Sequence, residues 1–231
     1  MREKVIGILG GMGPESTADF FLKVIRATHV PKDQDHLRII IDNNPKVPDR
    51  TLALLGKGES PLAEMKKTVQ NLEGAGAELI AIPCNTAYHY YDELQESTNL
   101  PIINMISETA KHIRGEFPNI KKIGLMATTG TMKAEIYHKE IKGIEIIAPD
   151  EGLQEKVMNA IYGEQGIKAG YREEPHNYVL EVASALIKQG AEAIIMGCTE
   201  ISLVLGQGDL LVPLVDPLQI LAEAVVREAR G

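Results

Sequence analysis

The sequence predicts an α/β fold with two similar lobes, each a parallel sheet flanked by helices, related by a pseudo-twofold axis. Short apolar, β-branched runs alternate with amphipathic stretches along all 231 residues. The runs are apolar throughout, which is typical of strands covered on both faces by helices. Three sequence blocks also recur in the same order about half a chain apart, which indicates a duplicated unit. We therefore expect the functional site in the cleft between two lobes.

The expected strands and helices alternate from one end of the chain to the other. Strands are expected at residues 5–9, 38–41, 79–82, 102–104, 122–126, 144–147, 193–196 and 212–215. Helical periodicity marks stretches such as 60–72, 107–114, 151–162 and 177–189. Pro14 follows the first strand and suits the first turn of a helix, so a helix is expected to begin there.

The duplication is clearest around the two cysteines. Gly76-Ala77-Glu78 precedes an apolar strand that ends at Cys84, and Gly190-Ala191-Glu192 precedes another that ends at Cys198 at the same spacing. The two other matched pairs are residues 5–9 with 122–126, and 100–103 with 212–215. The two cysteines are therefore expected at equivalent positions of the two halves.

Composition and charge exclude several classes of partner. The chain has 24 Lys plus Arg against 32 Asp plus Glu, a net charge of −8, and no basic block stands out. A general nucleic-acid surface is therefore not expected. No apolar stretch approaches the roughly 20 residues that span a bilayer, and the N-terminal run is too short for a signal peptide. We expect a cytoplasmic protein whose cysteines stay as free thiols.

Paired thiols in one cleft suggest a particular chemistry. Ligands of parallel α/β sheets bind beyond the carboxyl ends of the strands, where Cys84 and Cys198 are both expected. No Cys-x-x-Cys motif or histidine cluster completes a metal site, so no metal is expected. Two equal groups on opposite faces of one carbon are what inversion of a stereocentre requires, whereas inert buried cysteines are the alternative.

The abstracting thiolate needs help at neutral pH, because a free cysteine has a pKa of about 8.5. The N-terminus of a following helix is expected to supply that help. Asn85, Thr86 and Thr199 follow the cysteines and either cap these helices or contact the substrate. Glu200 is either an ordinary acid of a first turn or a group that tunes the thiol or binds a substrate ammonium.

Six motifs give the chain a resemblance to the aspartate/glutamate racemase superfamily, and specifically to the cofactor-independent aspartate racemases. They are Gly10-Gly11-Met12-Gly13-Pro14, Asn43-Asn44-Pro45, Pro48-Asp49-Arg50-Thr51, Pro83-Cys84-Asn85-Thr86-Ala87, Ala127-Thr128-Thr129-Gly130-Thr131 and Gly197-Cys198-Thr199-Glu200. The resemblance covers nearly the whole chain. It implies a homodimer that racemises a small acidic amino acid, most simply aspartate, without pyridoxal phosphate or another cofactor.

The resemblance also assigns roles to individual residues. Cys84 and Cys198 resemble the acid/base pair, with Cys198 acting on the L isomer and Cys84 on the D isomer. Arg50 resembles the carboxylate clamp, for which a planar guanidinium is suited, and Lys168 a second cation on a mobile loop. The expected substrate-binding residues are Met12, Arg50, Asn85, Thr86, Thr128, Thr129, Thr131, Lys168, Thr199 and Glu200. Tyr88 departs from the family, in which a histidine commonly stands there.

The resemblance implies in addition that the final helix returns to the first lobe. On this basis residues 1–99 and 213–231 are expected to form the first lobe, and residues 100–212 the second.

Other functions remain open from the sequence. Gly11-x-Gly13 after a strand suggests dinucleotide binding, but Ser16 replaces the third glycine and Asp42 comes later than the expected acid. A non-catalytic binder of small acids would share the cleft without needing two thiols. A glutamate or broad-specificity racemase, a decarboxylase or a double-bond isomerase of the same superfamily would reuse it. The same residues also have purely structural alternatives. Arg50 would form an ion pair with Asp49, Lys168 would be a solvated surface residue, and the threonines would cap helices.

Overall fold

The computed structural model describes residues 2–231 and, within them, contains two parallel sheets with strand orders β2-β1-β3 and β5-β4-β6-β7. The strands are β1 (Ile6–Gly10), β2 (Ile39–Asn43), β3 (Leu79–Ala81), β4 (Lys122–Ala127), β5 (Glu145–Ile147), β6 (Ile194–Gly197) and β7 (Leu214–Val215). In each sheet the first strand of that half is flanked by the next two along the chain. This confirms the α/β fold with two parallel sheets and two lobes.

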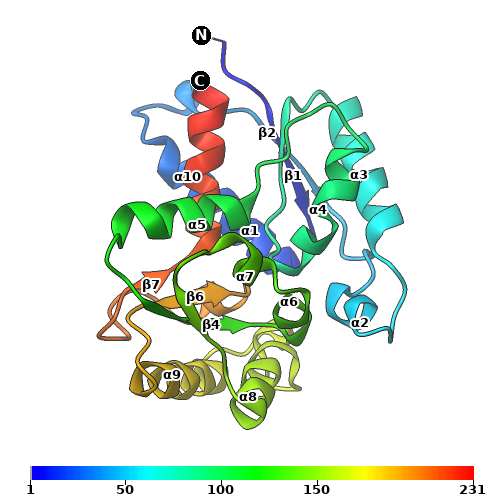
Figure 1. Cartoon of the computed structure of the whole chain (residues 1–231). Coiled ribbons are helices and arrows are strands. Elements are labelled where there is room, and N and C mark those ends of the chain that lie inside the picture. Colours follow the sequence, from blue (N-terminus) through cyan, green and yellow to red (C-terminus); the bar gives the residue numbers. More distant parts are fainter. Residues whose placement is uncertain (1) are drawn as a thin grey trace.

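Helices flank both sheets, and in Figure 1 strands β1 and β2 lie above β4, β6 and β7. The α-helices are α1 (Pro14–Thr28), α2 (Arg50–Leu54), α3 (Leu62–Gly74), α4 (Tyr91–Gln95), α5 (Met105–Glu116), α6 (Thr129–Ala134), α7 (Ile136–Glu140), α8 (Glu151–Tyr162), α9 (Glu173–Lys188) and α10 (Pro217–Arg230). The described chain also has short 3₁₀ helices at η1 (Asp33–Asp35), η2 (Thr86–Tyr90), η3 (Ile167–Ala169) and η4 (Ile201–Leu203). None of the described helices is long and apolar enough to cross a membrane.

The strand expected at residues 102–104 is wrong in its extent. Only Ile102 pairs with the first sheet, through an isolated parallel bridge to Ile80. The chain leaves the sheet at Asn104 because its side chain accepts from the backbone amides of Ile106 and Ser107 and caps α5. This bridge nevertheless occupies the place that β7 takes beside β6 in the second sheet.

The loop between β1 and α1 is held close to the end of β2. Pro14 is the first residue of α1, as expected, and Gly13 precedes it in an extended conformation. Gly11 has φ +93°, and a Cβ placed on it would lie 2.3 Å from the backbone carbonyl carbon of Asn44. Only glycine, which has no Cβ, allows the backbone at position 11 to lie this close to the backbone of Asn44. The backbone of Met12 and Gly13 is thereby brought to the carboxyl edge of the first sheet.

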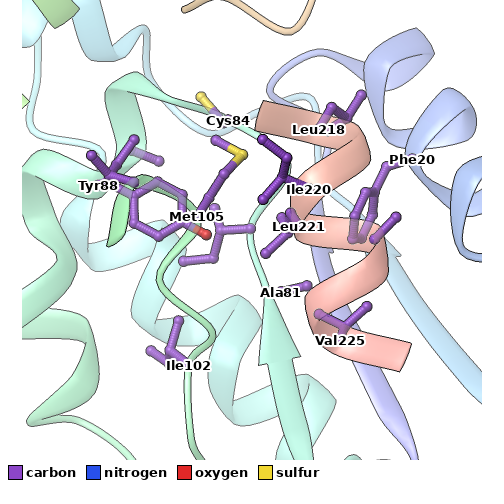
Figure 2. Close-up of a cluster of buried hydrophobic side chains, with 14 of the residues drawn as sticks. Phe20, Ala81, Cys84, Tyr88, Ile102, Met105, Leu218, Ile220, Leu221 and Val225 are labelled. Carbon is purple, nitrogen blue, oxygen red and sulfur yellow. The ribbon is translucent and has the colours of Figure 1, made fainter. Parts of the chain in front are cut away.

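The last helix packs against the first one. Figure 2 shows α10 between Phe20 of α1 and the strand that carries Ala81, and Leu218, Leu221 and Val225 of α10 share one buried cluster with both. The backbone amide of Lys4 also donates to the carbonyl of Ala229, so the two chain ends lie together, as Figure 1 shows. The lobe boundaries expected near residues 99 and 213 stay a prediction.

Candidate active site

One narrow cavity receives residues from both lobes at the carboxyl ends of their strands. Its walls are Met12, Arg50, Cys84, Asn85, Thr86, Thr128, Tyr162, Lys168, Cys198, Thr199 and Glu200. The free space holds about one water molecule. Both cysteines line this cavity, and both are free thiols.

Cys84 lies in the loop after β3 and faces the guanidinium of Arg50. The Arg50 side chain is buried, with 8% of the residue exposed, and donates to the backbone carbonyls of Val47, Pro48 and Met12 at 3.0–3.3 Å. Burial alone would lower the pKa of Arg50, but the nearby Cys84 and Asp49 raise it. Arg50 therefore remains a buried cation.

Arg50 has no carboxylate within 4.0 Å among residues 2–231, so the ion pair with Asp49 does not form. Asp49 instead caps α2 by accepting from the Leu52 amide, and also accepts from the Tyr162 hydroxyl. The Nε of Arg50 is buried and has no hydrogen-bond partner in the part of the chain that the structure describes. A buried guanidinium in this state is costly unless an anion completes it, and the cavity is where such an anion would sit.

Cys198 follows β6 and has a carboxylate for a neighbour instead of a guanidinium. Its Sγ donates to Oε2 of Glu200 at 3.0 Å, while Oε1 of Glu200 accepts from Nζ of Lys168 at 2.5 Å. Glu200 is 4% exposed. Burial works to raise the pKa of Glu200, but Lys168 and the hydrogen bonds from Cys198 and Lys168 lower it below its usual value. Glu200 is thus an ionised carboxylate that accepts from a thiol and an ammonium.

The expected help from a helix N-terminus is wrong for Cys198. Burial and the charge of Glu200 raise the pKa of Cys198 well above its ordinary value, and Lys168 offsets this only in part. The segments after the two cysteines are the short 3₁₀ helices η2 and η4, which lack the length of a helix dipole. Asn85 makes no capping hydrogen bond. A thiol beside a buried carboxylate keeps its proton.

The loop threonines divide into those that reach the cavity and those that do not. Thr86 and Thr128 line it, and their hydroxyls lie 3.1 Å apart, which joins the two lobes. Thr128 also caps α6 by accepting from the Thr131 amide. Thr131 lies behind them, with its hydroxyl 2.8 Å from that of Thr86. Thr129 is turned away because its hydroxyl accepts from the Gln154 amide at 3.3 Å. The structure therefore leaves two of the expected substrate contacts outside the wall.

Two tyrosines at the site carry no motif in the sequence. Tyr162, the last residue of α8, lines the cavity, with the Lys168 ammonium 5.4 Å from its ring centroid and its hydroxyl donating to Asp49 of the other lobe. Tyr137 of α7 is fully buried and donates from its hydroxyl to Oδ1 of Asn85 at 2.5 Å. The weak signal available was position, since Tyr162 comes only six residues before Lys168.

The residue that departs from the family does not enter the cavity. Tyr88 is buried, and its hydroxyl donates to the backbone carbonyl of Ile103 at 2.9 Å. Burial raises the pKa of Tyr88, so it stays neutral. Among residues 2–231, no three His, Cys, Asp or Glu side chains are placed to hold a metal ion.

Comparison with known proteins agrees with this geometry. The family described as Asp/Glu/Hydantoin racemase matches residues 9–225. The broad specificity amino-acid racemase RacX of Bacillus subtilis is 32% identical over 235 aligned positions that cover 96% of each chain. The aspartate racemase of Picrophilus torridus superposes with a TM-score of 0.89 at 28% identity, covering 98% of this chain and 94% of that one.

More distant structures share the fold alone. A glutamate racemase from Francisella tularensis, solved in complex with D-glutamate, has a TM-score of 0.71 at 19% identity and covers 99% of this chain and 81% of that one.

Proposed function

The chain belongs to the Asp/Glu/hydantoin racemase family, and from that premise we propose that it interconverts L- and D-aspartate by a two-thiol mechanism without pyridoxal phosphate. That it is an isomerase of the amino-acid racemase class follows from the family. The acidic substrate, the roles of the cysteines and the independence from cofactors are the proposal.

The observation that carries this proposal is a pair of thiols in one cavity, each at the end of the equivalent strand of its lobe. One thiolate takes the proton from the α-carbon, and the opposite thiol gives its own proton to the other face. The electron pair left on carbon in the first step forms the new C–H bond in the second. The enzyme ends with thiol and thiolate exchanged, so no oxidant or reductant is consumed.

The walls supply the charge that this carbanion chemistry demands. Within residues 2–231 Arg50 is a buried guanidinium without a carboxylate partner, and Lys168, which is paired with Glu200, is a second cation in the cavity lining. Together they suit a substrate with two carboxylates. Backbone amides beside Asn85 and Thr199 would stabilise the charge that develops as the proton leaves. Without a cofactor, the positioning of the substrate against these groups has to lower the barrier to forming the carbanion.

The two thiols have different neighbours. Cys84 lies beside the guanidinium of Arg50, whereas the thiol of Cys198 donates a hydrogen bond to Glu200, and burial together with that carboxylate raises the pKa of Cys198. In this proposal Cys84 takes the proton from the D isomer and the protonated Cys198 returns one to the other face. Turnover of the L isomer begins from the opposite form, in which the thiolate is on Cys198.

A second candidate is a racemase of broad specificity, which the similarity to RacX favours. Aspartate and glutamate differ by one methylene, and a pocket discriminates such a difference by only about 1–3 kcal/mol. The present cavity holds about one water molecule, so entry of any amino acid requires its walls to separate. How far they separate sets the range of side chains accepted.

The test uses purified protein with reductant and no added pyridoxal phosphate, in D₂O. L-Aspartate, L-glutamate and a neutral amino acid are incubated separately, and products are followed by chiral chromatography and mass spectrometry. We expect D-aspartate that carries deuterium at the α-carbon. Equal rates on the neutral amino acid would favour the broad-specificity candidate. Binding without deuterium incorporation would show a binder of acids, and loss of carbon dioxide would show a decarboxylase.

The homodimer and the cytoplasmic location belong to the same proposal. Sedimentation equilibrium of the intact protein is expected to give twice the 25.2 kDa chain mass. A monomer would remove the dimer from the proposal without touching the reaction. The location is tested by fractionation of the native cells with an antibody to the protein.

A further inference from the structure

The Asn85 amide is bonded at one end only. Its Oδ1 accepts from the Tyr137 hydroxyl at 2.5 Å. Its Nδ2 is buried and, within residues 2–231, has no hydrogen-bond partner. Asn85 is 3% exposed and lines the cavity. A buried amide nitrogen with two unused N–H groups is unfavourable in a folded protein unless a ligand or water satisfies it.

The Tyr137 hydroxyl decides which end of the amide faces the cavity. Burial raises the pKa of Tyr137 well above its ordinary value, with a smaller contribution from Asp216, so the hydroxyl keeps its proton. That proton needs an acceptor, and Oδ1 of Asn85 accepts it at 2.5 Å, while the neighbouring Thr109 hydroxyl donates its own proton to the carbonyl of Met105 at 2.7 Å. Were the amide turned over, Nδ2 would donate to the hydroxyl and the hydroxyl proton would lose that acceptor.

We propose that Tyr137 is a positioning residue that holds the Asn85 amide with Nδ2 directed into the cavity, as a donor to a carboxylate oxygen of the substrate. This inference rests on the proposed racemase function. The carboxylate beside the α-carbon gains negative charge when the proton leaves. A donor already aimed at that oxygen requires no reorganisation during the reaction.

The contact also joins the two lobes at the reacting centre. Asn85 follows Cys84 in the first half, and Tyr137 lies in α7 of the second half, which begins directly after Glu135 in a left-handed conformation with φ 53°. The position after Cys198 lacks such a contact, since the Thr199 hydroxyl lies 3.3 Å from Glu200 of its own loop. The hydrogen bond that positions the amide is therefore found on the Cys84 side of the cavity.

A double-mutant cycle tests whether Tyr137 acts through Asn85. Tyr137→Phe keeps the buried ring and removes only the hydroxyl, and we expect kcat/KM to fall about tenfold. Asn85→Ala should lower kcat/KM by at least as much. The double variant should lower kcat/KM no further than Asn85→Ala alone. Tyr91→Phe is the matched control, because its hydroxyl donates to the backbone carbonyl of Ile102. Wild-type kinetics in Tyr137→Phe, or losses that add in the double variant, would overturn the inference.

A second measurement does not depend on turnover. The side-chain amide signals of Asn85 are identified in ¹⁵N-labelled protein by their disappearance in Asn85→Ala. In Tyr137→Phe we expect these signals to shift and to exchange faster with water, whereas Tyr91→Phe leaves them in place. Unchanged Asn85 signals in an active Tyr137→Phe enzyme would refute the positioning role. Altered signals in a protein that racemises nothing would support the amide geometry and reject the proposed function instead.

Discussion

The two half-sites share a backbone plan but differ in charge. Cys84 follows β3, which pairs with β1, and Cys198 follows β6, which pairs with β4 in the same way. Cys84 faces the guanidinium of Arg50, whereas Cys198 donates to the carboxylate of Glu200. Duplication thus accounts for thiols in one cavity, and divergence of their neighbours places a cation beside Cys84 and a carboxylate beside Cys198. Near-symmetric geometry does not imply equivalent chemistry.

The half-sites also differ in how they reach the other lobe. On the first side, Asn85 bonds to Tyr137 and Thr86 contacts two threonines of the second lobe. On the second side, Glu200 bonds within its own lobe to Lys168, and this pair lies against Gly13 of the first. The residues after Cys84 therefore bond directly across to the second lobe, whereas the Lys168 side is joined to the first lobe by other residues, Tyr162 to Asp49 and Arg172 to Glu15.

The largest effect is expected when one of the two thiols, the feature that the half-sites share, is removed. Cys84→Ala and Cys198→Ala should each lower racemisation by about 10³-fold or more, because each deletes one of two obligatory proton carriers. Chiral chromatography of L- and D-aspartate reactions measures this for both directions. Calorimetry with unreacted substrate is the control for binding, and near-normal racemisation by either variant would exclude a two-thiol mechanism.

The next effect removes the cation specific to the Cys84 side. Arg50→Ala should lower kcat/KM by about 100-fold, because a charge-assisted bidentate contact is lost. Arg50→Lys keeps the charge without the planar fork and should lie between Ala and wild type. Steady-state kinetics for each variant gives the comparison, and unchanged KM and kcat in Arg50→Ala would place the carboxylate clamp elsewhere.

A third variant makes the second half-site less acidic. Glu200 is among the causes that raise the pKa of Cys198, so Glu200→Gln should lower that pKa. Lys168, which would no longer be paired with a carboxylate, also lowers the pKa of Cys198. In a Cys84→Ser background, the pH midpoint of Cys198 alkylation should move to lower pH by about one unit, a tenfold gain in thiolate at a given pH below it. A midpoint that stays or moves upward would show that Glu200 does not hold the proton on Cys198.

The smallest effect is expected from substitutions of Thr128 and Thr129, two neighbouring threonines that should differ in their contribution to activity. Thr128→Val removes a cavity hydroxyl and the cap of α6, so we expect a measurable loss of activity and about 1 kcal/mol of stability. Thr129→Val removes a hydroxyl that faces Gln154 and should leave kcat/KM within about twofold of wild type. Thermal unfolding and kinetics of the pair decide the matter. A large kinetic defect in Thr129→Val would return Thr129 to the substrate-binding wall.

Much of the fold was predictable because its causes are local. The strand at Lys122–Ala127 and the helix at Glu151–Tyr162 follow from apolar runs and helical spacing that any window of the sequence displays. Residues 102–104 mislead for the same reason, since they are apolar enough for a strand. The Asn104 cap decides instead that the chain turns into α5.

The site was predictable only where a motif marks it. Cys84, Arg50 and Cys198 stand in the motifs of the family and line one cavity. Thr129 stands in the same kind of motif, yet its side chain points to Gln154, because the start of α6 turns successive residues to different faces. Tyr137 has no motif at all, and its contact joins residues 52 positions apart.

The amino-acid sequence by itself determined the two α/β lobes and the pair of cysteines, because hydrophobic period and internal repetition are properties of neighbouring residues. The tertiary structure alone decided which charge each thiol meets, which threonines face the cavity and which end of the Asn85 amide is free. Those outcomes depend on side chains from distant segments meeting in a buried space. There each polar group must find a partner or remain open for a ligand.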